Sequence, residues 1–287
     1  MNTLYGYVKK VLCDAGIDDG EARAVALLLL EKVCGLTTAE ALMADVQSLG
    51  EKAEKVLEMA RRVAGGVPVQ YALGEADFCG LSISVRSGVL IPRPETQGLV
   101  EWVAEDGDAV RVLDVCTGSG CVAVALAKCF PDAVLEAWDV SDEALEVART
   151  NVERCGVEVG LKKVDVLNES DVAENMGSGW DVIVSNPPYV CEAEAAEIEP
   201  HVLDYEPRIA LFVPDEDPLR FYRHIAQMGM EGLRDGGRVY FEINRRFGRE
   251  VVDMLTGMGY VEVELRQDFR GNDRMVKAIK KAEISLL

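Results

Sequence analysis

In the second half of the chain, short apolar runs alternate with stretches whose apolar residues recur at helical spacing. The runs at 110–115, 134–139 and 180–185 have the length and composition of buried strands. Strands that alternate with helices predict a doubly wound, mostly parallel sheet. We therefore expect an α/β domain over residues 96–287, whose last two strands lie at 260–266 and 275–280.

Residues 1–66 show a different pattern, which predicts a small helical bundle. Asp18 or Asp19 can cap a helix that runs to Val33, because Gly35 stands just beyond its end. Thr37 and Glu40 have the spacing of a capping box, and they predict a second helix through Gln47. Apolar residues at helical spacing predict a further helix over 51–63.

Residues 67–95 separate these two regions. Gly65-Gly66-Val67-Pro68 breaks the helical pattern and indicates a boundary. Leu81, Ile83 and Val85 then alternate with polar residues, which predicts a strand in a linking β-hairpin. The expected order is thus a helical bundle (1–66), a linker with a β-hairpin (67–95) and the α/β domain (96–287).

The strand at 110–115 leads into a turn that contains Gly118 and Gly120, followed by a helical pattern. Glycines at such a turn let a ligand approach the backbone closely. The turn lacks the G-x-G-x-x-G spacing of dinucleotide loops, because Ala123 stands where the third glycine would be. It also lacks the G-K-[ST] ending of phosphate loops. The next strand ends in Asp139, a carboxylate placed to bind ribose hydroxyls. This combination suits a nucleoside ligand without phosphates, such as S-adenosylmethionine.

The strand at 180–185 ends in Asn186-Pro187-Pro188-Tyr189. Each proline fixes φ and lacks a backbone donor, and Asn186, which precedes a proline, is biased to an extended backbone. Two acceptors are therefore held close together, the Asn186 side chain and the backbone carbonyl of Asn186 or Pro187. Such a pair suits a planar NH₂ group with a delocalised lone pair, which the ring of Tyr189 can cover. An ordinary strand-to-loop turn is the alternative interpretation.

Further motifs resemble those of the HemK-type family, whose members methylate the glutamine amide of peptide-chain release factors. The most specific motif is Arg93-Pro94-Glu95-Thr96. The other matching segments are Pro68–Gly74, Phe78-x-Gly80-Leu81, Val89–Pro92, Glu206–Phe212, Phe221-Tyr222 and Asp268-x-x-Gly271-x-Asp273-Arg274. The resemblance runs from about residue 68 to residue 278. It implies a Rossmann-like class I methyltransferase fold with an antiparallel last strand, S-adenosylmethionine as cofactor, and a release factor as protein partner.

The chain departs from the family pattern in three places. Cys116 stands where the family usually has glycine, which is expected to narrow the methionine end of the cofactor pocket. Val213–Pro218 replaces a more glycine-rich loop, and Glu242–Gly248 replaces a shorter glutamate-x-glycine turn. Each departure is expected to affect the fine geometry of the cofactor or the substrate.

The candidate site residues follow from these motifs. We expect the cofactor to contact Asp114, Cys116, Thr117, Gly118, Ser119, Gly120, Asp139, Asp165, Val166 and Asn186. We expect Asn186, Pro187, Pro188 and Tyr189 to be catalytic and to bind the substrate. The resemblance places Arg93 and Glu95 near the active site, and we expect them to bind the substrate as well.

Structural alternatives stay open for several of these residues. Asp139 can instead cap the helix at Ser141, and the glycines can serve a purely structural tight turn. Asp165 can be a solvated strand-end acid, and Arg93 with Glu95 can form an interdomain salt bridge.

The proposed chemistry needs no nucleophilic residue and no strong base, because two aimed acceptors orient the nitrogen and stabilise its developing charge. Consistently, the chain has only two histidines, His201 and His224, so we expect no metal site.

The eight cysteines of the chain include no C-x-x-C pair and are expected to be buried thiols in a reducing cytosol. The N-terminus lacks the apolar core of a secretion signal, and no apolar run is long enough to span a bilayer. We expect a cytoplasmic monomer without a membrane partner.

Charge bears on the substrate class. The net charge of the chain is −20. Residues 1–74 have 8 basic and 10 acidic side chains and carry −2 of it. The remaining residues have 22 basic and 40 acidic side chains and carry −18. Nucleic-acid binding relies on basic surface, so we expect no direct nucleic-acid partner. A nucleic-acid methyltransferase that acts on an exocyclic amine remains the first rival, and a catalytically silent cofactor-binding module the second. The helical bundle is expected to help bind the protein substrate, with a merely stabilising cap as the alternative.

Overall fold

The computed structural model describes residues 3–282. Residues 1–2 of the predicted helical bundle and residues 283–287 of the predicted α/β domain lie outside the described residues. The chain divides into two compact units. One comprises the residues up to Glu75 together with Glu199–Tyr205, and the other comprises Ala76–Ile198 and the residues from Glu206 onward.

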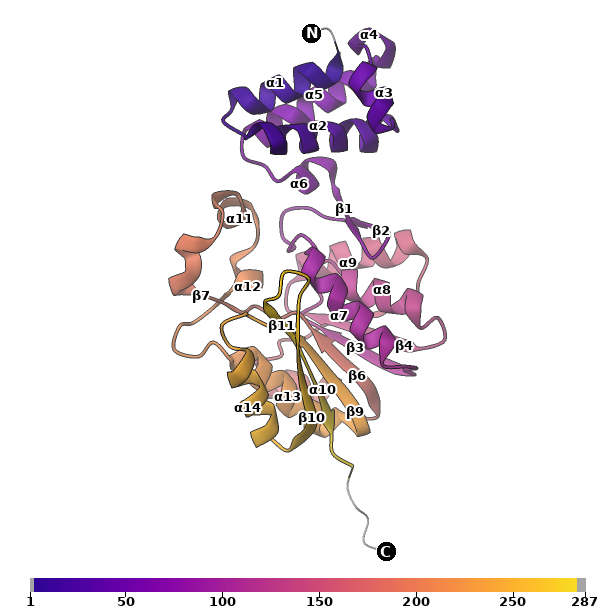
Figure 1. Cartoon of the computed structure of the whole chain (residues 1–287). Helices are drawn as coiled ribbons and strands as arrows, with labels where there is room; N and C mark the ends of the chain where they lie inside the picture. The colour runs from indigo at the N-terminus through magenta and orange to yellow at the C-terminus, as the bar shows by residue number, and fades with distance from the viewer. Residues whose placement is uncertain (1–2, 283–287) are drawn as a thin grey trace, which may run out of the picture. The chain divides into compact units, whose positions relative to one another are not determined.

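The first unit is helical (Figure 1). Its elements are α1 (Leu4–Asp14), α2 (Asp19–Cys34), α3 (Thr38–Met43), α4 (Val46–Leu49), α5 (Glu51–Ala64), α6 (Val69–Leu73) and α11 (Pro200–Tyr205). As predicted, Asp18 caps α2 by accepting from the backbone N–H groups of Gly20 and Glu21, and Gly35 ends the helix at φ 73°.

The predicted helix from Thr37 through Gln47 was wrong in its length. The capping box exists, since Thr37 N–H donates to the Glu40 carboxylate at 2.9 Å and the Thr37 hydroxyl accepts from Glu40 N–H. The helix nevertheless ends at Met43, because Ala44 is extended and Asp45 accepts from Gln47 N–H to start α4. A short acid that bonds the nearby backbone competes with helix continuation.

The core of the helical unit consists of apolar residues at helical spacing. Leu4, Val8 and Leu12 of α1 are fully buried in one cluster with residues of α2 and α5. Ala72 of α6 belongs to the same cluster, so the helical unit continues beyond the break at Gly65-Gly66.

The predicted hairpin is present as a two-stranded sheet of β1 (Glu75–Phe78) and β2 (Leu81–Ser84). Ile83 and Val85 are buried, as the alternation predicts. The turn between the strands places Cys79 at φ 48° and Gly80 at φ 73°.

The second unit is built on a seven-stranded sheet with the order β10-β11-β9-β6-β3-β4-β5. Its strands are β3 (Arg111–Val115), β4 (Val134–Asp139), β5 (Gly160–Lys163), β6 (Trp180–Ser185), β9 (Leu233–Glu242), β10 (Tyr260–Gln267) and β11 (Asp273–Lys280). Neighbouring strands from β9 to β5 are parallel, whereas β11 is antiparallel to both β9 and β10. The mostly parallel sheet with an antiparallel last strand is therefore confirmed.

Helices cover both faces of this sheet (Figure 1). They are α7 (Pro94–Glu105), α8 (Cys121–Cys129), α9 (Asp142–Cys155), α10 (Glu169–Asn175), α13 (Arg220–Gly232) and α14 (Gly248–Gly257). The short elements between β6 and α13 are β7 (Val190–Cys191), the 3₁₀ helix η1 (Glu192–Glu197), α12 (Arg208–Leu211) and β8 (Phe212–Val213). Within the described residues, no helix has both the length and the apolar character that crossing a bilayer requires.

The sheet topology determines where a ligand can bind. The first strand of the sheet, β3, lies between β4 and β6, so the strand order reverses beside it. Ligands of doubly wound folds bind at such a switch point, outside the carboxyl ends of the strands. Both the Gly118–Gly120 turn and Asn186 follow strands at this point.

Candidate active site

A cavity of about 340 Å³ lies at the carboxyl ends of β3, β4, β5 and β6. Gly118, Asp139 and Asn186, which each lie at or just after the end of a predicted strand, line this one cavity. The predicted site residues that line the cavity are Arg93, Asp114, Cys116, Thr117, Gly118, Ser119, Asp139, Asp165, Val166, Asn186 and Pro188. Gly120, Pro187, Tyr189 and Glu95 do not line it.

Asp114 anchors the glycine turn after β3. One oxygen of its buried carboxyl accepts from the Thr117 hydroxyl at 2.6 Å and from Ala123 N–H at 3.1 Å. Burial, with a smaller contribution from the nearby charge of Asp139, raises the pKa of Asp114 to about 7, although the two hydrogen bonds oppose the shift. With this pKa, the Asp114 carboxyl is expected to be partly protonated near neutral pH.

Cys116, the departure in the turn, has φ 61°. This left-handed conformation suits glycine and costs a side chain with a Cβ about 1–2 kcal/mol. The residue lines the cavity, and burial raises the pKa of its thiol, so the thiol stays protonated. A neutral thiol group therefore lines the cavity at the position where the family usually has glycine.

Asp139, at the end of β4, connects the turn to the next helix. Its two oxygens accept from Gly118 N–H at 2.8 Å and from Ser141 N–H at 2.9 Å. Ser141 is itself the N-cap of α9, so Asp139 does not fill that role. Asp139 is half-buried, and each of its carboxylate oxygens keeps a lone pair for a further donor. Burial raises the pKa of Asp139.

The third acid, Asp165, follows β5. Its carboxylate accepts from Leu167 N–H at 2.9 Å. The adjoining wall is apolar, since Val164 and Val166 are buried and line the cavity with Leu167 and Val140. Three carboxyls beside an apolar wall suit a cationic ligand with a flat ring.

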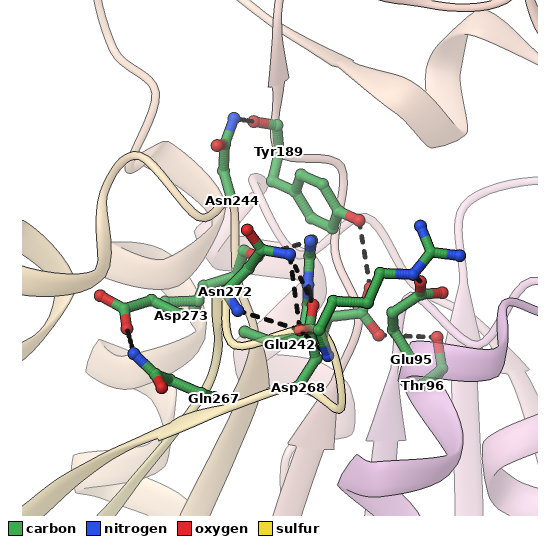
Figure 2. A network of polar contacts seen from close by, with 12 residues as sticks. Glu95, Thr96, Tyr189, Glu242, Asn244, Gln267, Asp268, Asn272 and Asp273 are labelled. Carbon is green, nitrogen blue, oxygen red and sulfur yellow. Dashed lines mark hydrogen bonds and ion pairs between the residues drawn. The ribbon is translucent and has the colours of Figure 1, made fainter.

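Asn186 lies at the end of β6, where its amide is already oriented. Its Nδ2 donates to the Thr96 hydroxyl oxygen at 3.2 Å, and the Thr96 hydroxyl donates to Glu242 Oε2 at 2.6 Å. Figure 2 shows the contact between Thr96, at the start of α7, and Glu242, at the end of β9. The Asn186 carbonyl oxygen is thereby left as the acceptor that this side chain offers.

Tyr189 is held away from the cavity wall. Its hydroxyl donates to Glu242 Oε1 at 3.1 Å, and its backbone carbonyl accepts from Asn244 Nδ2 at 3.0 Å (Figure 2). Both partners belong to Glu242–Gly248, the segment that departs from the family pattern. These two hydrogen bonds therefore hold Tyr189, the last residue of the Asn186–Tyr189 turn, against this segment.

Arg93 and Glu95 have separate partners. Arg93 lines the cavity and pairs with the buried Glu206 at 2.6 Å, and Glu206 also accepts from Ile91 N–H at 3.0 Å. Both residues belong to the second unit, so the pair is not an interdomain bridge. Glu95 lies 3.9 Å from Arg270 instead.

Sequence reasoning assigned no site role to several residues that the structure brings to the site. Thr96 and Glu242 are the clearest, although Glu242 ends an apolar strand as Asp139 does, which is a signal the sequence carries. Further residues that line the cavity are Val89, Leu90, Pro92, Pro207, Ile209, Phe212, Arg220 and Phe221. They come from loops, α12, β8 and α13, where spacing does not predict a ligand contact.

Comparisons with known proteins agree with this geometry. The family model described as "Methyltransferase small domain" matches residues 94–202, and "PrmC N-terminal domain" matches residues 4–74. A solved methyltransferase from Pyrococcus furiosus superposes with a TM-score of 0.53 at 21% identity, covering 71% of this chain and 90% of that one. At this identity the match supports the fold alone.

Curated relatives match most of the chain. A release factor glutamine methyltransferase from Bacteroides thetaiotaomicron is 43% identical over 280 residues, covering 97% of this chain and 99% of the relative. Proteins of the same description from Flavobacterium psychrophilum (43%, covering 73% and 74%) and Streptococcus pneumoniae (39%, covering 82% and 83%) also match. This chain therefore belongs to the release factor glutamine methyltransferase family.

Proposed function

We propose that this enzyme transfers a methyl group from S-adenosylmethionine to the side-chain amide nitrogen of a glutamine in a peptide-chain release factor. The observation that carries the proposal is the orientation of Asn186. Its amide nitrogen is engaged by Thr96, so its carbonyl oxygen is the acceptor for an N–H group in the cavity. The relatives, whose printed names specify release factors and glutamine, support this choice of substrate.

The cavity residues fit the cofactor. When bound, S-adenosylmethionine supplies an electrophilic methyl group on a cationic sulfonium. Asp139 has lone pairs for the ribose hydroxyls, and Val164, Val166 and Leu167 provide an apolar wall for adenine. Asp114 and Asp139 place negative charge near a cation. We propose a reaction without a metal, whose cofactor product is S-adenosylhomocysteine.

The protein then has to prepare the nucleophile. An amide nitrogen shares its lone pair with its carbonyl, so orientation and charge stabilisation are the main requirements. Asn186 Oδ1 and a neighbouring backbone carbonyl accept the two N–H bonds and direct the nitrogen toward the methyl group. The same acceptors stabilise the positive charge that develops there. No residue has to remove a proton before transfer. The S–CH₃ bond breaks as the N–CH₃ bond forms, and the nitrogen then loses one of its two protons to solvent, which leaves a neutral N-methyl amide.

Two rival functions are less well supported. An enzyme that methylates adenine or guanine amines in nucleic acid would need a basic surface and a flipped base, whereas this chain carries a net charge of −20. A silent cofactor-binding module has no use for an aimed acceptor at Asn186. We also propose that the helical unit binds the protein substrate, and that the enzyme works as a cytoplasmic monomer without a nucleic-acid or membrane partner.

Label transfer tests the proposal. The enzyme is incubated with methyl-labelled S-adenosylmethionine and a purified release factor, and the labelled residue is located by mass spectrometry. We expect one methyl group on a glutamine side chain, and no label in a release factor in which that glutamine is replaced by alanine. Label on another residue type, or none in any release factor, would contradict the proposal.

A further inference from the structure

The polar network behind the Asn186–Tyr189 turn centres on one buried carboxyl. Glu242, the last residue of β9, is 1% exposed and does not line the cavity. Its Oε2 accepts from the Thr96 hydroxyl at 2.6 Å, and its Oε1 accepts from the Tyr189 hydroxyl at 3.1 Å (Figure 2). Thr96 in turn accepts from Asn186 Nδ2 at 3.2 Å. A continuous chain of hydrogen bonds thus leads from Glu242 to Asn186.

The direction of this chain is determined at Glu242. An ionised carboxylate only accepts hydrogen bonds, and a threonine hydroxyl has one proton to donate. The distance of 2.6 Å is that of a charge-assisted O–H···O⁻ bond, so the Thr96 proton points to Glu242. The Thr96 oxygen can then only accept from Asn186. Asn186 must therefore turn its NH₂ group to Thr96 and its carbonyl oxygen the other way.

We infer that Glu242 is a positioning residue for methyl transfer, which determines through Thr96 which end of the Asn186 amide faces the substrate nitrogen. The inference rests on the proposed function, because the orientation matters only where the substrate offers N–H groups. Neither Glu242 nor Thr96 has to touch the substrate nitrogen. Their contribution is to keep an acceptor, rather than a donor, directed at it.

The groups around Glu242 make the direction sensitive to pH. The titratable groups that act on Glu242 are Arg274, Tyr189, Tyr222 and Glu95. Burial raises the pKa of Glu242, whereas the bonds from Thr96 and Tyr189 and the positive charge of Arg274 oppose the shift. A protonated Glu242 can donate to Thr96. The Thr96 hydroxyl is then free to donate to the Asn186 oxygen, which would turn the NH₂ group toward the substrate.

This consequence separates positioning from simple structural support. If Glu242 only joined β9 to α7 and the turn, its loss would lower stability but leave the pH dependence of the chemical step unchanged. Under the positioning role, the rate of methyl transfer falls with decreasing pH as Glu242 takes up a proton. That decline disappears when Thr96 no longer links Glu242 to Asn186.

The experiment uses the full-length enzyme with saturating methyl-labelled S-adenosylmethionine and a purified release factor, in single turnover from mildly acidic to neutral pH. Thr96→Val removes the hydroxyl with little change in shape. We expect its single-turnover rate constant to fall about ten- to a hundredfold, as for other losses of alignment, while the KM values from steady-state assays change less. Thr96→Ser keeps a hydroxyl and should restore most of the rate.

Two further variants complete the test. Glu242→Gln can donate to Thr96 and should lose both rate and pH dependence. Thr256→Val removes a hydroxyl that only donates to the backbone carbonyl of Val252, and it should behave as the parent does.

The outcomes distinguish the inference from the function on which it rests. A parental rate and pH profile in Thr96→Val would overturn the positioning role while the parent enzyme still methylates the release factor. A slow Thr96→Val with the parental pH profile would also overturn it, since the link to Glu242 would then not set the direction. An inactive parent enzyme would instead overturn the proposed function, and the inference with it.

Discussion

At the scale of single residues, Asn186 provides the most direct test of the amide-binding mechanism. Asn186→Ala deletes the acceptor and leaves a substrate N–H unpaired in a desolvated cavity. Removing one preorganised group of this kind costs about 2.7–4 kcal/mol of barrier, so the rate should fall at least about a hundredfold. Asn186→Asp keeps an acceptor but adds a charge, and we expect a rate between those of Ala and the parent.

Single-turnover methylation of a release factor measures this order. Cofactor affinity, measured alongside by calorimetry, should change much less, because the carboxyls and the apolar wall that fit the cofactor lie elsewhere in the cavity. A near-parental rate for Asn186→Ala would show that the amide is not held in this way.

Asp139 should control cofactor binding. Each charge-assisted hydrogen bond contributes about 1.5–3 kcal/mol, so Asp139→Ala should weaken S-adenosylmethionine binding at least about tenfold in calorimetry. Asp139→Asn keeps one acceptor for Gly118 or Ser141 and should lie between Ala and the parent. Circular dichroism checks that the fold is intact. Unchanged affinity in Asp139→Ala would remove this carboxylate from the cofactor site.

We expect cofactor binding to be linked to the loss of a proton from the Asp114 carboxyl. Its pKa, raised by burial to about 7, means that the carboxyl is partly protonated at neutral pH. A cationic cofactor favours the ionised form, so binding should release protons near pH 7, and affinity should rise as the pH increases toward that value.

Calorimetry in two buffers of different ionisation enthalpy counts the released protons. Asp114→Asn retains an acceptor for Thr117 and Ala123 N–H, which both bond the same carboxyl oxygen. This variant should release fewer protons than the parent. An equal number in both would place the proton on another group.

Residue roles were predictable only in part. Positions at strand ends, such as Asp139 and Asn186, could be assigned because parallel strands end at one edge of the sheet. The direction of Tyr189 could not, because its hydroxyl partner Glu242 and its carbonyl partner Asn244 come from a distant segment. Likewise, Glu95 lies beside Arg270, which no local spacing indicates.

At the scale of elements, the two glycines of the turn before α8 are required for different reasons. A Cβ on Gly118, at φ 55°, would meet nothing within 4 Å, whereas one on Gly120, at φ 77°, would lie 3.0 Å from the Cβ and 3.2 Å from the Cα of Ala148 in α9. Gly118→Ala should therefore cost only conformational strain, about 1–2 kcal/mol. Gly120→Ala adds a steric conflict with a neighbouring helix, for a total of about 2–4 kcal/mol.

Denaturant unfolding measures both free energies. Gly118→Ala should weaken cofactor binding more than its stability loss suggests, because its Cβ adds to the lining of the cavity. Equal stability losses in the two variants would argue against the close packing of the turn on α9.

Elements with strong periodicity were predictable almost to the residue. The strands at 134–139 and 180–185 have the predicted bounds, since they are buried apolar runs between clear turn signals. The helix predicted to reach Gln47 divides instead, because Asp45 caps a new helix where the apolar pattern alone does not show a break.

At the scale of the whole molecule, periodicity predicts an alternating α/β sheet but does not specify its strand order. The antiparallel last strand followed from the family resemblance, since a strand's direction depends on how its connections cross the sheet. Nor does spacing show that Glu199–Tyr205 belongs with the helical unit, where the Tyr205 hydroxyl donates to the Gly65 carbonyl at 3.2 Å. Such long-range pairing is a property of the folded chain.

The charge of the whole molecule predicts its substrate class. The two basic clusters in the sequence, Arg245-Arg246 with Arg249 and the segment from Lys277, include residues with acidic partners. Arg246 pairs with Glu197 at 2.7 Å, and Lys277 pairs with Asp106 at 3.2 Å. With Arg246 and Lys277 paired and a net charge of −20, phosphate backbones should be repelled.

We therefore expect methyl label in a release factor and none in DNA or ribosomal RNA, in reactions that contain all three. The decisive condition is low salt, where charges are least screened and any attraction to phosphate is strongest. Scintillation counting of the separated protein and nucleic-acid fractions measures the result. Because low salt favours the rival substrate, absence of label there argues more strongly against a nucleic-acid substrate than absence at physiological salt. Robust labelling of either nucleic acid would mean that local chemistry at Asn186, rather than the charge of the molecule, determines the substrate.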